Sequence, residues 1–136
     1  MFATKHWLVA ALIVAAFEIL AGQDKGVKAS NAWVKLPASG ETDAMAFVTI
    51  ENAGMYEVNV TAAKSDAAGK VELRDGGQTV TFITVPSYGR VDMAPNGAHL
   101  LLIGLKRPLK AGDAVSLTLS TDSDVTLTVA AQVRTE

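Results

Sequence analysis

The feature that most constrains the fold is a succession of short segments in which apolar and polar residues alternate. It begins at Val27 and continues almost to the C-terminus. In "AMAFVTIEN" (residues 44–52), alternate side chains fall on opposite faces, as they do in a half-buried strand. Glycine- and proline-containing turn signals separate the segments, and the strongest are "DGG" at residues 75–77 and "APNG" at residues 94–97. No helical periodicity follows residue 22, so these residues predict strands joined by tight turns.

The pattern predicts about nine short strands. They are the segments NAWVKL, AMAFVTIEN, EVNVTAAKS, KVELR, QTVTFITV, RVDM, AHLLLIGL, AVSLTLS and VTLTVAAQV. Many short strands at near-regular spacing without helices are typical of an antiparallel β-sandwich or Greek-key barrel. At 136 residues, the chain is long enough for one such domain with its own apolar core.

Residues 1–22 have a different composition from the rest. Lys5 precedes an apolar run over residues 7–17, which Glu18 then interrupts. This layout is that of a secretory signal, and the run is shorter than the roughly 20 residues of a spanning helix. Two alternatives remain: a signal peptide that is removed, or an uncleaved hydrophobic helix that anchors the chain. In an anchor, Glu18 would contact a partner helix, because an unpaired carboxylate in lipid is costly. Either alternative exports the domain of residues 23–136.

Composition excludes several kinds of function. The formal net charge of −2 provides no basic surface for nucleic acid. The absence of cysteine excludes disulfides, thiolate metal sites and thiol catalysis. No serine lies in a nucleophile-elbow motif, and no histidine has a recognisable acid–base partner in the sequence. We therefore expect a protein that is not an enzyme.

The segments "NAWVKLPASGETDAMAFVTIENAG" and "NGAHLLLIGLKRPLKAGD" resemble the periplasmic copper chaperones of the PCuAC type. The resemblance implies a cupredoxin-like β-sandwich on the periplasmic side of the inner membrane, with Cu(I) as cargo. It also implies a protein partner, namely a membrane copper enzyme such as cytochrome oxidase or its assembly factors. The family's ligands are histidines and methionines, including a His-x-Met at the start of the "GLKRPL" strand. Thioether sulfur and imidazole suit Cu(I) because the ion is soft.

Residue by residue, the chain departs from that ligand set. His99 matches the histidine of the His-x-Met element, but Leu101 occupies the methionine position. Arg74 stands where the family's first ligand segment is expected, and a guanidinium cannot ligate a metal. Met93, on the other side of the 94–97 turn, is the candidate second donor for His99. The alternatives are a two-donor copper site of His99 and Met93, or a packed His99 whose metal site has been lost.

Two functions are consistent with these residues. In the first, the chain handles periplasmic copper or helps to assemble a copper enzyme, with an incomplete copper site. In the second, it is an accessory subunit of a membrane complex that binds no metal and uses the same fold as an interaction module. The number of soft donors favours the second function, whereas the family resemblance favours the first.

Overall fold

The computed structural model describes residues 26–135, and every regular element among them is a strand. The hydrophobic helix expected over residues 1–22, and Glu18 within it, lie outside the described residues. In the part of the chain that is described, no helix is long and apolar enough to cross a membrane.

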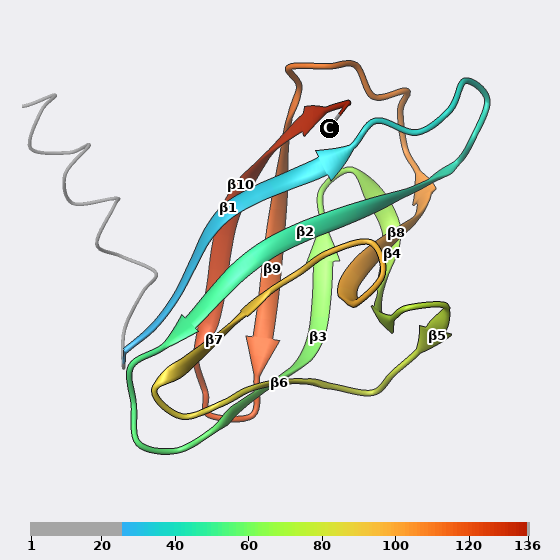
Figure 1. Ribbon diagram of the computed structural model, residues 1–136. Helices are drawn as coiled ribbons and strands as arrows, with labels where there is room; N and C mark the ends of the chain where they lie inside the picture. The colour runs from blue at the N-terminus through green and yellow to red at the C-terminus, as the bar shows by residue number, and fades with distance from the viewer. Residues whose placement is uncertain (1–25, 136) are drawn as a thin grey trace, which may run out of the picture.

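Ten strands make up the domain, and Figure 1 labels them in chain order. They are β1 (Val27–Lys35), β2 (Asp43–Asn52), β3 (Val58–Ser65), β4 (Ala68–Asp75), β5 (Gln78–Thr79), β6 (Ile83–Val85), β7 (Gly89–Asp92), β8 (Ala98–Leu105), β9 (Ala114–Thr121) and β10 (Thr126–Arg134).

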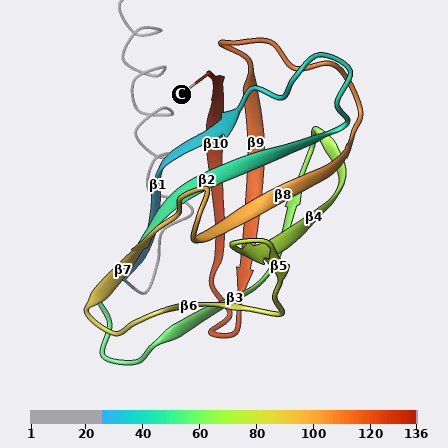
Figure 2. The same ribbon diagram turned by 45° about the vertical axis from the view of Figure 1, so that its right-hand side comes forward.

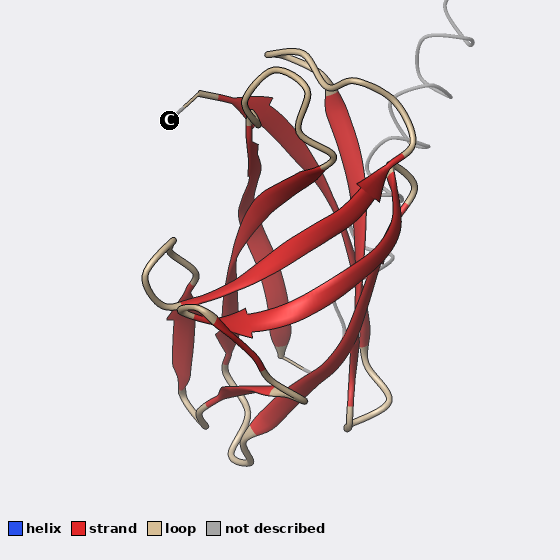
Figure 3. Cartoon of the chain, turned by 90° about the vertical axis from the view of Figure 1, so that its right-hand side faces the viewer, coloured by secondary structure: helices blue, strands red, loops and turns tan. Residues whose placement is uncertain are grey.

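One continuous hydrogen-bonded sheet runs in the order β5-β4-β8-β2-β1-β10-β9-β3-β6, with β7 also paired to β2. The sheet folds over on itself, so β2 crosses in front of β9 and β3 in Figure 1, and both β2 and β8 cross in front of β9 in Figure 2. Figure 3 shows the resulting two-layered, all-strand domain from the side. The all-β prediction is therefore confirmed.

Two details of the predicted fold were wrong. The segment "QTVTFITV" was predicted as one strand, but it divides into β5, which pairs with β4, and β6, which pairs with β3. The count is therefore ten rather than nine. The sheet is also not wholly antiparallel, because β1 and β10 pair in parallel. These strands lie far apart in the chain, so no hairpin fixes their relative direction.

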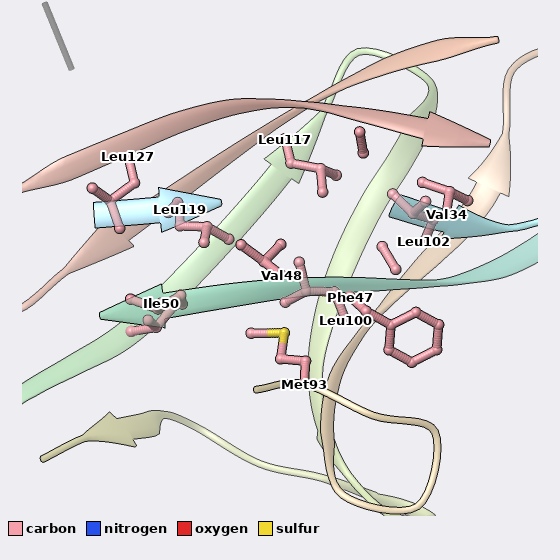
Figure 4. Packing of buried hydrophobic residues seen from close by; sticks show 14 of the residues in the cluster. Val34, Phe47, Val48, Ile50, Met93, Leu100, Leu102, Leu117, Leu119 and Leu127 are labelled. Carbon is pink, nitrogen blue, oxygen red and sulfur yellow. The ribbon is translucent and has the colours of Figure 1, made fainter. Parts of the chain in front are cut away.

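The core lies between the two layers of the folded sheet. The alternation predicted for β2 is observed, and the face formed by Ala44, Ala46, Val48 and Ile50, each at most 4% exposed, points into this core. Figure 4 shows Val48 and Ile50 packed in the same core as leucines from β8, β9 and β10. Phe47 points to the opposite face of β2, yet it is only 1% exposed, so the outer face has a packed cluster of its own.

Candidate functional site on the outer face of β8

His99 is buried on the outer face of β8. Its neighbours in sequence, Leu100 and Leu102, are fully buried in the core, so His99 and Leu101 point the other way. Only 2% of His99 is exposed, and its Nδ1 lies 2.9 Å from the carbonyl oxygen of Gly97. A carbonyl can only accept, so Nδ1 is the donor, and in the neutral ring Nε2 carries the lone pair. Nε2 makes no hydrogen bond to any residue in the range 26–135.

Two aromatic rings bury His99 from the side of β2 and β1. The Phe47 ring lies 6.1 Å from the imidazole, and the Trp33 ring lies 4.7 Å from Phe47, measured between ring centroids. Trp33 and Phe47 are direct partners in the β1–β2 register. Arg134 stacks over Trp33, with its guanidinium carbon 4.4 Å from the ring centroid. We call Trp33, Phe47 and His99 the outer aromatic row.

Arg74 flanks His99 from the other side. The two residues are direct partners in the antiparallel β4–β8 pairing, so their side chains share the outer face. Nη1 of Arg74 donates to Glu72 Oε1 at 3.3 Å and to Thr79 Oγ1 at 3.0 Å, and Nη2 donates to the Gly77 carbonyl at 3.2 Å. Arg74 Nε is the one fully buried side-chain nitrogen or oxygen between residues 26 and 135 that has no hydrogen-bond partner. The guanidinium is therefore held in place beside His99 by its own hairpin.

Glu72 balances the charge of Arg74. Desolvation of the carboxyl raises its pKa, but the hydrogen bond and charge of Lys70 and the hydrogen bonds from Thr79 and Arg74 outweigh this effect. The pKa of Glu72 is lowered as a result, and the carboxylate stays ionised opposite two cations. The site therefore contains a Lys70–Glu72–Arg74 charge group along β4.

Leu101 lies on the same outer face as His99, between Met45 of β2 and Glu72 of β4. Leu101 and Met45 line a groove of about 540 Å³, which also includes Lys35 and Glu41. The position that the resemblance assigned to a methionine ligand thus forms part of an apolar groove with charged residues beside it.

Met93 lies on the core side of the sheet. Its backbone N–H donates to the carbonyl of Val48 at 3.3 Å, and its side chain packs in the buried cluster together with Val48 and Ile50 (Figure 4). His99 instead contacts Phe47, whose side chain points away from that core. The structure does not bring Met93 and His99 onto one face, and a copper site shared by both stays a prediction that requires the 93–98 hairpin to rearrange.

The sequence did not identify the outer aromatic row or the bonding partners of Arg74. A signal for Phe47 was present, because the alternation in residues 44–50 places this large aromatic residue on the face opposite Ala46 and Val48. Nothing local in the sequence marked Thr79 or Gly77. No group of three or more histidine, cysteine, aspartate or glutamate side chains with metal-binding geometry occurs in residues 26–135.

The chain is similar to several known proteins. Residues 27–133 match the family described as "Putative lipoprotein LpqE-like". A protein of Leifsonia xyli subsp. xyli, "Putative lipoprotein Lxx21020", is 36% identical over 121 residues, which is 82% of this chain and 72% of that protein.

The solved structures that resemble it are PCuAC domains and a related copper protein. The copper-bound PCuAC domain from PmoF2 is 25% identical with a TM-score of 0.74, and the match covers 82% of this chain and 94% of that one. The Cu(I) form of DR1885 from Deinococcus radiodurans is 28% identical with a TM-score of 0.69, and the match covers 86% and 80% of the two chains. The PCuAC resemblance is confirmed at the level of the fold, and the chain belongs to the LpqE-like family.

Proposed function

We propose that this chain is a non-catalytic, exported domain that serves copper handling outside the cytoplasm as a protein-docking module, without a high-affinity copper site of its own. The observation that carries the proposal is the fixed guanidinium of Arg74 directly opposite His99. A cation beside the one imidazole disfavours a second positive charge there, and it supplies no donor lone pair.

The donor set of the outer face also does not fit Cu(I) as a tightly held cargo. Soft thioether and imidazole ligands suit that ion, and the face offers His99 flanked by Arg74 and Leu101. Met45 is a thioether on the same face, but it pairs with Leu101 rather than with His99. In this proposal copper is therefore the cargo of the pathway and not a ligand of this domain.

A second candidate function is supported by the tautomer of His99. Its Nδ1–H is engaged with Gly97, which leaves the lone pair of Nε2 free of any described partner. A single imidazole of this kind can act as one ligand in a site completed by thioethers of another protein. In that case the domain would take part in copper transfer only while docked.

A competition titration tests whether the chain has a high-affinity copper site of its own. The purified protein is titrated with Cu(I) against a chromophoric chelator, next to His99→Gln and the double variant Arg74→His/Leu101→Met. We expect no competition by the natural chain and at least tenfold tighter binding by the double variant, since it adds two soft donors beside His99. The matched control is Lys70→His, which adds an imidazole to the same strand opposite Ile103. Tight binding by the natural chain that is lost in His99→Gln would refute the proposal.

The docking role is tested in cells. We propose that the partner, a membrane copper enzyme or one of its assembly factors, contacts the groove of Met45 and Leu101. In a strain that lacks this chain, Met45→Asp should fail to restore copper-enzyme activity in membranes, because it places a charge on the apolar lining of the groove. Thr128→Asp, at an exposed position of β10, serves as the control. Equal restoration by both variants would exclude the groove as the docking surface.

The proposed location is the outer side of the cytoplasmic membrane. The family and the Leifsonia relative are described as lipoproteins, which supports an exported, membrane-associated protein. The 136 residues include no cysteine, so no thiol among them can carry a lipid. We propose that residues 1–22 contribute to its attachment to the membrane.

A further inference from the structure

One end of the domain carries several large apolar side chains that are exposed to solvent. Four large apolar side chains between residues 26 and 135 are strongly exposed, and three of them, Met55 (63%), Tyr56 (78%) and Tyr88 (72%), lie on two loops. These loops are residues 53–57, between β2 and β3, and residues 86–88, between β6 and β7. Figure 1 shows both at the lower left, next to the start of β1. We call these two loops the tyrosine end.

Hydrogen bonds hold the two loops to one another. The N–H of Tyr88 donates to the Gly54 carbonyl at 3.1 Å. Asn52 is only 2% exposed, and its side-chain amide donates to the carbonyls of Tyr56 at 2.9 Å and Val85 at 3.4 Å. Its Oδ1 accepts from the N–H of Gly54 at 2.9 Å. A buried amide that spans both loops keeps the tyrosines in place on a fixed frame.

The backbone at Tyr88 adopts an uncommon conformation that turns toward solvent. Its φ is +53°, in the left-handed region. The other described non-glycine residues with positive φ are Asn31 and Asp124, which are types that tolerate this region. A bulky residue there is an outlier, and such strain persists only where the surroundings enforce it, often at functional surfaces. The strain at Tyr88 therefore supports a role for this end beyond packing.

The N-terminal part of the chain emerges at the same end. The N–H of Ala53 donates to the carbonyl of Gly26 at 2.9 Å, and Val27 pairs with Asn52. Residues 22–25, "GQDK", separate Gly26 from residues 7–21, which are apolar except for Glu18. Four extended residues span at most about 14 Å. A surface that holds residues 7–21 must therefore lie close to the tyrosine end.

We propose that the tyrosine end is a membrane-contact surface, in which Met55, Tyr56 and Tyr88 rest at the level of the lipid headgroups while residues 1–22 stay attached to the chain. Tyrosine favours this position because its ring is apolar and its hydroxyl is polar. The exposed acids Glu51 and Glu57 lie near these side chains, and the exposed bases Lys28 and Arg90 are both register partners of Glu51. Because these charges offset one another, the surface fits the neutral headgroups of phosphatidylcholine better than an anionic lipid.

The absence of cysteine makes a direct test possible, because a single introduced cysteine labels one position only. The full chain is synthesised in the presence of phosphatidylcholine vesicles, either as Met55→Cys or, as the control, as Ser39→Cys. The introduced cysteine is then labelled with a nitroxide. Ser39 is exposed in the loop after β1, at the other end of a nine-residue strand. That strand places the two labels about 30 Å apart. Electron paramagnetic resonance then measures how far a water-soluble nickel complex and oxygen reach each label.

We expect the nickel accessibility at position 55 to be at least twofold lower than at position 39, with oxygen accessibility higher. Tyr56→Ser combined with Tyr88→Asn should return position 55 to the value of position 39, while the chain still floats with the vesicles. Equal nickel accessibility at both positions, no effect of the double variant, or failure to float would each overturn the proposal. Two results in native membranes would also overturn the proposal. The first is a label at position 55 that is shielded in native membranes but exposed in vesicles, which would indicate a protein partner. The second is a mature chain that lacks residues 1–22.

Discussion

The buried amide of Asn52 provides the sharpest test of how the loops are held. Its side chain makes three hydrogen bonds, to Tyr56, Val85 and Gly54, and 2% of the residue is exposed. Asn52→Ala leaves the Val85 carbonyl and the Gly54 N–H without that partner. An unsatisfied buried group costs about 1–3 kcal/mol. Only the Val85 carbonyl is buried away from water, whereas water can reach the partly buried groups of Tyr56 and Gly54. We therefore expect Asn52→Ala to lower the free energy of unfolding by about 1–3 kcal/mol.

The assay is urea unfolding followed by circular dichroism, with Asn52→Asp as the matched variant. Aspartate keeps the acceptor for Gly54 but replaces the donor to two carbonyls with a carboxylate oxygen. Burial and those carbonyls should raise the pKa of the introduced carboxyl, so its stability deficit should shrink as pH falls and the group becomes protonated. A loss below about 0.5 kcal/mol in Asn52→Ala would refute the reasoning, because that is the size of an ordinary surface change.

Three further predictions concern stability. Trp33→Ala should lower the free energy of unfolding in urea by about 3 kcal/mol, because it removes a large ring packed on Phe47. Arg134→Ala should lower it by less than about 1 kcal/mol, because the stacking of Arg134 on Trp33 is exposed. The hydrogen bonds from Asn59 lower the pKa of Asp122 from its ordinary value of 3.8. The stabilising contribution of Asp122 is therefore complete above pH 3.8 and is lost as the pH falls further. Asp122→Asn should flatten this part of the acid unfolding curve, and an unchanged curve would contradict the assignment. Tyr88→Asn should raise stability by about 0.5–1 kcal/mol, since asparagine tolerates the positive φ at that position, and a loss would mean that the ring packs more than its exposure indicates.

Local sequence determined two kinds of feature: the alternation of side chains within a strand, and the tight turns between strands that are neighbours in the chain. The division of β2 side chains between two faces followed from a period of two, which depends only on the extended backbone. The "DGG" signal produced the β4–β5 hairpin, in which Asp75 pairs with Gln78 and Gly76 has a φ of +61°. Such features need no knowledge of the rest of the chain, and the sequence predicted them correctly.

Partner choice between strands was decided by the tertiary structure. Residues 78–85 are uniformly strand-like in sequence, yet β5 and β6 join opposite ends of the sheet order. Likewise, the parallel pairing of β1 with β10 joins segments nearly a hundred residues apart along the chain. These pairings are long-range, and no local preference encodes which strand another strand will meet.

The same division applies to the candidate site. The sequence by itself determined the residue types: His99 as the one histidine after residue 22, with Arg74 and Leu101 at the positions that the family resemblance assigns to ligands. Only the tertiary structure placed Arg74 directly opposite His99, Met93 on the core side, and Phe47 against the imidazole. The physical reason is register, because a shift of one residue between β4 and β8 would send every side chain to the other face.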